Sequence, residues 1–219
     1  MRFLITHVTG RTGRSVARAL LGAGHGVVGL GDETSRLVDP RVDLRPGRAD
    51  DLHALAAATG GEPVDAVLHL PDSDTFLPVA AADGDTRIVV LLPDDPAEAD
   101  AQVATWAAHP QALLVRPAPY AGRGVGPAEM RTLSGLLAAA PDSSWRLVHP
   151  DDVERFLVGE LTHGSATGTV HLAASGTVRA SDAVRRLHEV GVRKAPRGVA
   201  PLPVPAPVEV LAEFAPGWT

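Results

Sequence analysis

The chain has 219 residues, of which 45% are hydrophobic and 21% charged, and its formal net charge is −6. This length suits one domain, or one domain with a small lobe, and allows a sizeable core without disulfides or metals. The absence of cysteine excludes thiolate nucleophiles and cysteine metal sites, and the acidic balance without any basic run argues against a nucleic-acid partner.

The N-terminal segment predicts a strand, a turn, a helix and a second strand. Residues 3–5 are a short apolar run, and residues 6–13 are rich in Gly and Thr. Apolar residues then recur at helical spacing over 15–23, and residues 27–30 form a second apolar run. This order is that of a βαβ unit, whose crossover is right-handed.

The alternation continues along the chain. Further strands are expected at 42–44, 64–70, 87–92, 112–115, 145–148 and 169–173. Further helices are expected at 50–58, 97–108, 127–140 and 151–162, with a last one capped by Ser181 and ending at Val190. The pattern predicts an α/β fold, a Rossmann-like doubly wound parallel sheet with a small C-terminal lobe. We expect a nucleotide-binding core at 1–122, a lobe at 123–195 that completes the same domain, and a proline-rich tail at 196–219.

The turn at residues 6–13, Thr-His-Val-Thr-Gly-Arg-Thr-Gly, stands where such sheets bind nucleotides. A turn between the first strand and the first helix presents backbone N–H groups and a helix N-terminus to a pyrophosphate. Two glycines alone are a weak signal, but their position after the first strand strengthens it. The residues expected to bind the ligand here are Thr6, Thr9, Gly10, Arg11, Thr12 and Gly13.

In several of these segments the chain resembles the short-chain dehydrogenase/reductase superfamily, in its extended (epimerase/dehydratase-like) and atypical branches. Residues 6–13 resemble the Thr-Gly-x-x-Gly-x-x-Gly turn of the family, residues 24–30 its second strand and residues 64–70 its fourth. Arg116-Pro117 resembles the pair after the sixth strand, and residues 149–153 resemble a late His-Val-Asp-Asp-Val segment. The resemblance covers most of residues 1–190 and implies a Rossmann-like fold that binds NADP or NAD.

Two departures from the family concern this cofactor. The first glycine of the family is His7 here, and a bulky imidazole in the turn keeps open the hypothesis that no dinucleotide binds. The acidic residue that the family uses for the adenosine ribose is replaced by Gly31, with Asp32 one position later. NADP is favoured over NAD because a guanidinium matches phosphate geometry, although solvated surface arginines remain the alternative. The candidates for the 2′-phosphate are Arg11, Arg14 and Arg36.

The redox residues of the family are missing. In the family a Tyr exchanges the proton and a Lys four residues later lowers its pKa. Gly124 stands four residues after Tyr120, the only tyrosine, and Val190 stands four residues before Lys194, the only lysine. Residues 87–100 also contain no serine. The sequence therefore predicts that the usual hydride transfer of the family is absent.

Other polar residues follow the predicted strands, at the edge where open α/β sheets hold their active sites. Asp94 and Asp95 are candidates for acid and base, if burial beside one another separates their pKa values. His69 is a candidate general base, and Tyr120 a candidate ligand contact. Each has a structural alternative, namely a helix cap for the two aspartates, a buried structural histidine and a loop-packing tyrosine.

His149 with Asp152 is expected to be structural, and no metal site is expected because no two histidines lie three or four positions apart. The first apolar run is too short for a signal peptide, and no stretch approaches a membrane span, so we expect a cytoplasmic protein. The apolar side of the helix at 97–108 predicts either a homodimer contact or core packing.

The leading hypothesis is a divergent protein of the short-chain dehydrogenase type with a nucleotide or small-molecule cleft. It would be an enzyme with relocated acid/base groups, or one without net redox such as an epimerase/dehydratase-like enzyme or a cofactor-independent isomerase, dehydratase or cyclase. The alternative is a non-catalytic NAD(P)-binding sensor or a partner-binding pseudoenzyme.

Overall fold

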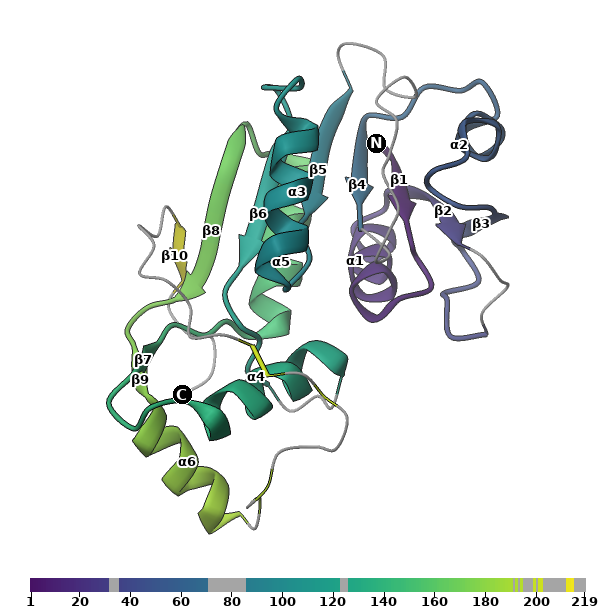
Figure 1. The fold of residues 1–219 in the computed structure, drawn as a ribbon. Coiled ribbons are helices and arrows are strands. Elements are labelled where there is room, and N and C mark those ends of the chain that lie inside the picture. The colour runs from purple at the N-terminus through teal and green to yellow at the C-terminus, as the bar shows by residue number, and fades with distance from the viewer. Residues whose placement is uncertain are drawn as a thin grey trace. The chain divides into compact units, whose positions relative to one another are not determined.

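The computed structural model describes residues 1–31, 36–70, 86–122, 126–190, 192, 194, 199, 201–202 and 212–214. Strands and helices alternate through most of them (Figure 1). The strands are β1 (Arg2–Thr6), β2 (Gly26–Gly31), β3 (Asp43–Pro46), β4 (Ala66–His69), β5 (Arg87–Leu91), β6 (Leu113–Pro117), β7 (Ser144–Trp145), β8 (Gly168–Ala174), β9 (Val178–Arg179) and β10 (Ala212–Phe214). The helices are α1 (Arg11–Gly22), α2 (Leu52–Thr59), α3 (Pro96–Trp106), α4 (Pro127–Ala138), α5 (Pro150–Thr162) and α6 (Ala180–Glu189).

The main sheet has the strand order β10-β8-β6-β5-β4-β1-β2-β3. Strand β1 pairs in parallel with β2 and β4, so that Leu4 lies opposite both Val28 and Val67. The order reverses its direction between β1 and β4, as in doubly wound sheets, where ligands bind beyond the carboxyl ends of the strands. The predicted Rossmann-like α/β fold is confirmed.

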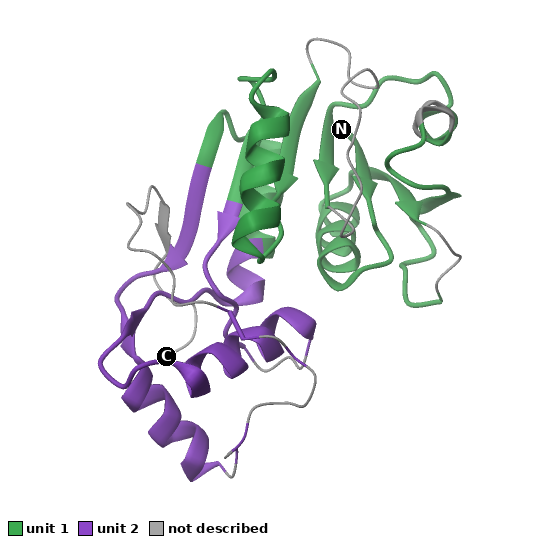
Figure 2. Cartoon of the chain, in the orientation of Figure 1, with its two compact units in different colours: residues 1–115, 154–169 green, residues 116–153, 170–219 purple. Residues whose placement is uncertain are grey.

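The chain divides into two compact units, residues 1–115 with 154–169 and residues 116–153 with 170–219 (Figure 2). The predicted domain boundaries at 122 and 195 stay a prediction.

Helices cover the sheet of the first unit because alternate strand residues face opposite sides. One core cluster joins strand residues such as Leu4, Val28 and Val90 to α2 and α3. Helix α1 contacts α5 instead, where the Ser15 hydroxyl donates to Glu154 Oε2 over 2.5 Å. Trp106 of α3 is 1% exposed and belongs to the core cluster, and Val103 packs against it. The apolar side of α3 therefore packs on the core of its own unit.

The second unit has a smaller core around Leu136, Trp145 and Ala180. A Cβ added to Gly135 of α4 would lie 2.6 Å from the carbonyl oxygen of Leu202, so the chain at residue 202 crosses α4 in close contact. The Leu202 N–H donates to the Arg131 carbonyl over 3.3 Å. Part of the predicted proline-rich tail is thus packed onto this unit.

Three predicted element boundaries are corrected. Helix α1 begins at Arg11 and not at Ser15, since Gly10 already has the extended conformation of an N-cap. The strand expected at 145–148 is limited to Ser144–Trp145. Ser181 does not cap α6, which begins at Ala180.

The start of α6 has a physical reason. Ala180 is buried, and its N–H donates to the Ser143 carbonyl over 2.9 Å, while the Ser181 N–H donates to the Pro141 carbonyl over 3.0 Å. Main-chain carbonyls therefore satisfy helix N–H groups that a side-chain cap would otherwise take.

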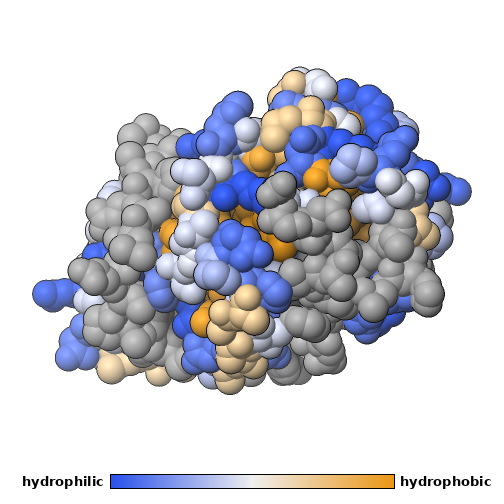
Figure 3. Space-filling view, turned by 90° about the horizontal axis from the view of Figure 1, so that it is seen from above, coloured by the Kyte–Doolittle hydropathy of each residue, from blue (hydrophilic) through white to orange (hydrophobic). Residues whose placement is uncertain are grey.

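Within the described residues, no helix has the length and apolar character needed to span a bilayer. The face seen in Figure 3 mixes hydrophilic side chains with smaller hydrophobic areas. Among the described residues, the exposed large hydrophobic side chains are Met1, Leu37, Val178 and Val190.

Candidate functional site

The turn between β1 and α1 is fixed by main-chain hydrogen bonds. The Val8 N–H donates to the Leu30 carbonyl over 3.1 Å, and the Gly10 N–H donates to the His7 carbonyl over 3.0 Å. Among the described non-glycine residues, His7 is the one with positive φ, at 49°. This is the left-handed region that favours glycine. Position 7 therefore has a backbone conformation that glycine adopts without strain.

Glycines allow the turn to lie close to its neighbours. A Cβ at Gly13 would be 2.7 Å from the Val8 Cα, so α1 packs directly on the turn. A Cβ at Gly29 would be 2.5 Å from Val8 Cγ1, and one at Gly31 would be 3.0 Å from Thr9 Cγ2. Gly29 and Gly31 of β2 thus leave the space that the side chains of Val8 and Thr9 occupy. Sequence reasoning missed this role, although the Gly-Leu-Gly spacing at 29–31 carries the signal.

The imidazole of His7 lies against Gly10. A Cβ added to Gly10 would be 2.6 Å from Cδ2 and 2.8 Å from Nε2 of this ring. In dinucleotide-binding turns, the second glycine leaves room for the pyrophosphate to approach the backbone. Here that room is taken by the His7 ring.

The start of α1 is suited to an anion. Its N-cap, Gly10, makes no side-chain capping bond, and its first turn contains no acidic residue. The first turn carries Arg11, which is exposed, and Arg14, whose guanidinium donates to the Thr9 carbonyl over 2.6 Å. Cations at the positive end of a helix dipole are unfavourable, and a bound phosphate would offset both charges. Apart from the His7 ring, the turn therefore fits the phosphate groups of a dinucleotide.

The other residues predicted to bind a cofactor are placed as follows. Thr12 and Thr9 are half-buried, and Arg36 is exposed beyond β2. Asp32 lies outside the described residues.

Thr6 and His69 meet at the carboxyl ends of β1 and β4. Both are fully buried, and Thr6 Oγ1 is hydrogen-bonded to His69 Nδ1 over 2.9 Å. The same hydroxyl accepts from the Leu70 N–H, also over 2.9 Å. These contacts hold two neighbouring strand ends together, which favours the structural alternative for His69. The roles of Thr6 in binding and of His69 in catalysis stay predictions.

Asp94 and Asp95 follow β5 and are half-buried. Asp95 Oδ1 accepts from the N–H groups of Ala97 and Glu98, over 2.9 and 3.1 Å, and so caps α3. This geometry is the helix cap weighed as the alternative to acid/base work. Catalysis by this pair stays a prediction.

Tyr120 and His149 belong to the second unit. Tyr120 forms an isolated parallel bridge with Val148, and a Cβ at Gly122 would lie 3.2 Å from His149 Nε2. His149 Nδ1 accepts from the Asp151 N–H over 3.2 Å, at the start of α5. The structure therefore brings the loop of Tyr120 beside His149, whose imidazole serves as a helix cap.

Sequence reasoning missed one pair in the second unit. Burial lowers the pKa of His171 in β8, and the positive charge of Arg116 in β6 adds to the effect. This proximity depends on the pairing of two strands far apart in the sequence, so no local pattern signals it.

In the described part of the chain, no group of three or more His, Asp or Glu side chains gathers in a way that would hold a metal ion. A groove of about 710 Å³ runs between α4 and α6 in the second unit. Its lining includes Leu137, Pro141, Ala180, Val184, Arg185 and His188. The residues predicted as site residues do not line it.

Comparisons with known proteins place the fold. No family model matches the sequence, and neither does any curated protein. Solved structures do match. UDP-glucose 4-epimerase from Thermus thermophilus, solved with NAD, has 15% identity and a TM-score of 0.66, over 96% of this chain and 89% of that one. UDP-glucose 4-epimerase from Thermotoga maritima, solved with UDP-glucose, has 14% identity and a TM-score of 0.66, over 93% and 89%.

A third match is dTDP-glucose 4,6-dehydratase from Bacillus anthracis in complex with NAD, with 12% identity and a TM-score of 0.66, over 89% and 82%. The fold is that of the extended short-chain dehydrogenases/reductases. The predicted resemblance is confirmed at this level. At such identities the likeness concerns the fold alone.

Proposed function

We propose that the protein binds an adenine dinucleotide, NADP in preference to NAD, at the turn between β1 and α1. The carrying observation is the left-handed backbone of His7, which keeps the turn in its glycine-type conformation beside an acid-free helix start. Arg11 and Arg36 would bind the 2′-phosphate, and the N–H groups at the start of α1 would face the pyrophosphate.

We further propose that the protein is a cytoplasmic enzyme that acts on a small molecule without the Tyr/Lys reaction of the family. A bound nicotinamide supplies or accepts a hydride, and the accompanying proton would need a group other than a Tyr-x-x-x-Lys pair. Asp94 and Tyr120 are the candidates to hold or move that proton. A non-redox reaction, such as a dehydration or an isomerisation, would use the same groups.

A second candidate is a non-catalytic sensor or a partner-binding pseudoenzyme. The observation that favours it is the structural use of two catalytic candidates. Asp95 caps α3, and His69 is fully buried against Thr6. An Asp94→Asn variant that keeps full turnover on an identified substrate would remove Asp94 from the catalytic candidates. A homodimer is also part of the proposal, and the mass of the protein in solution tests it.

Cofactor titration tests the proposal. The purified protein is titrated with NADPH and NADH, and binding is followed by nicotinamide fluorescence and by thermal shift. We expect tighter binding of NADPH, and an Arg11→Ala or Arg36→Ala variant should lose more affinity for NADPH than for NADH. Arg186→Ala, on exposed α6, is the matched control and should leave both affinities unchanged. Lack of any response at millimolar NADPH or NADH would refute dinucleotide binding.

A further inference from the structure

His7 has a backbone conformation typical of glycine, whereas Gly10 has one that any residue can adopt. His7 has a φ of 49°, in the region that favours glycine. Gly10 has φ −68° and ψ 167°, which any residue adopts. A glycine at position 10 is therefore required by space and not by backbone conformation. The atoms that occupy this space are those of the His7 ring, within 2.8 Å of where a Cβ would be.

This arrangement has a cost. A residue with a Cβ is less stable than glycine in the left-handed region, because its Cβ lies too close to the following carbonyl oxygen. The imidazole is half-buried and lies on Gly10 at the N-terminus of α1, with Arg11 following directly. A phosphate that approached the Gly10 backbone would have to displace the ring.

We propose that the His7 side chain is a plug in the dinucleotide site, which competes with the pyrophosphate for the space over Gly10. The inference rests on the proposed function and adds its control: ligand binding requires the ring to turn away from Gly10. The wild-type protein therefore binds dinucleotides weakly, because part of the binding energy is used to displace the ring. Removing the ring frees the space over Gly10 without straining the backbone, since glycine adopts the conformation already present at position 7 without a steric penalty.

The experiment compares the wild type with His7→Gly and His7→Asn. Asparagine tolerates the left-handed region and has a smaller side chain, so it guards against a change in backbone freedom. NADPH and ADP are the pyrophosphate-bearing probes, and adenosine is the probe without phosphate. We expect His7→Gly to bind NADPH and ADP at least tenfold more tightly than the wild type, with His7→Asn between them. The affinity for adenosine should not change.

A second measurement tests the packing itself. Gly10→Ala places a methyl group against the ring and should lower the melting temperature of the wild type. In the His7→Gly background the same substitution should have little effect on the melting temperature.

The outcomes separate the two proposals. If the wild type and His7→Gly bind NADPH equally well, or the variant binds it more weakly, the plug is refuted while dinucleotide binding stands. If neither protein binds NADPH or ADP, both proposals fail. If Gly10→Ala is equally destabilising in the two backgrounds, the ring does not occupy the space over Gly10 in solution.

Discussion

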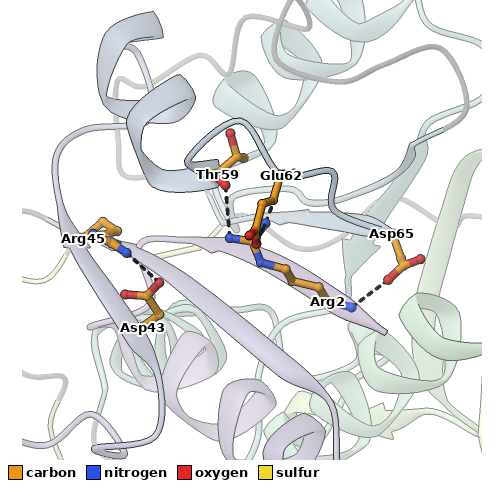
Figure 4. A network of polar contacts seen from close by, with 6 residues as sticks. All are labelled: Arg2, Asp43, Arg45, Thr59, Glu62 and Asp65. Atoms are coloured by element: carbon orange, nitrogen blue, oxygen red, sulfur yellow. Dashed lines mark hydrogen bonds and ion pairs between the residues drawn. The ribbon is translucent and has the colours of Figure 1, made fainter.

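The two ends of β1 are held to neighbouring segments by different groups. An arginine makes the contacts at the amino end, and a buried hydroxyl makes them at the carboxyl end. At the amino end, the Arg2 N–H donates to Asp65 Oδ2 over 2.6 Å, and its guanidinium donates to the carbonyls of Glu62 and Thr59 over 3.0 and 3.1 Å (Figure 4). At the carboxyl end, a buried Thr6 hydroxyl meets His69 and the Leu70 N–H. The positive charge at the amino end, that of Arg2, is therefore hydrogen-bonded to carbonyl groups within the protein. Beyond the carboxyl end, α1 begins with Arg11 and Arg14 and without an acidic residue.

This difference separates stability from ligand binding. The amino end of β1 is expected to contribute to stability alone. The buried contact at Thr6 should also be structural, whereas the first turn of α1 should serve an anion at a small cost in stability.

The largest effect is expected for Thr6→Val. The valine leaves His69 Nδ1 and the Leu70 N–H buried without the hydroxyl, which should cost about 2–4 kcal/mol of unfolding free energy. Urea denaturation measures this loss. Thr6→Ser keeps the hydroxyl and serves as the control, with a loss of about 1 kcal/mol for the missing methyl group. Equal losses in the two variants would mean that the hydrogen bonds at Thr6 contribute little.

Arg2→Ala should have a smaller effect, because the Arg2 side chain is 27% exposed and water can replace part of its contacts. We expect a loss of about 1 kcal/mol in urea denaturation. The affinity for NADPH should be unchanged, since β1 places Arg2 at the opposite strand end from the turn. A large loss of affinity in this stable variant would contradict the separation of roles.

Arg11→Glu should raise the stability of the protein, in contrast to the two preceding substitutions. A negative charge in the first turn of α1 interacts favourably with the helix dipole, so the unfolding free energy should rise by about 0.5 kcal/mol. The affinity for NADPH should fall, because the same charge repels phosphate. Arg18→Glu, later in the same helix and also exposed, is the control for a general change of net charge. If Arg11→Glu neither raises the stability nor lowers the affinity for NADPH, the helix start does not have the proposed role.

The smallest effect concerns pH and the second unit. Because the pKa of His171 is lowered in the folded protein, the unfolded chain takes up this proton first. Stability should be unaffected well above the ordinary value of 6.5 and should fall as the pH drops below it. His171→Asn should reduce the difference in melting temperature between pH 7.5 and pH 5.5. The exposed His163→Asn is the control and should keep the wild-type difference.

The sequence predicted the parts of the fold that depend on local pattern. The glycine turn, the βαβ order and the apolar central strands follow from spacing alone, and the positions of β1, β2 and β5 agree with it. Ser181 shows where local pattern fails. Serine is a good helix cap, but the burial of Ala180 and the carbonyls of residues 141 and 143 decide where α6 begins.

In the candidate site, too, some features follow from the sequence and others only from the structure. The presence of His7 in the turn is visible in the sequence, whereas the position of its ring over Gly10 depends on φ at residue 7. The contact of His69 with Thr6 depends on the pairing of β4 with β1, which sequence spacing does not specify. The carboxylate of Asp95 was correctly located at a helix start, but its hydrogen bonds follow from the path of the chain after β5.

The crossing of residue 202 over Gly135 has a consequence for protein engineering. Strand β10, later in the same tail, pairs in parallel with β8 at the margin of the sheet. Shortening the protein at residue 195 would remove the contact of residue 202 with α4 and would also leave Leu172–Ala174 of β8 without their β10 partners. Exposed edge strands of this kind can pair with strands of other molecules. A shortened version should therefore self-associate, and expression vectors should retain the tail.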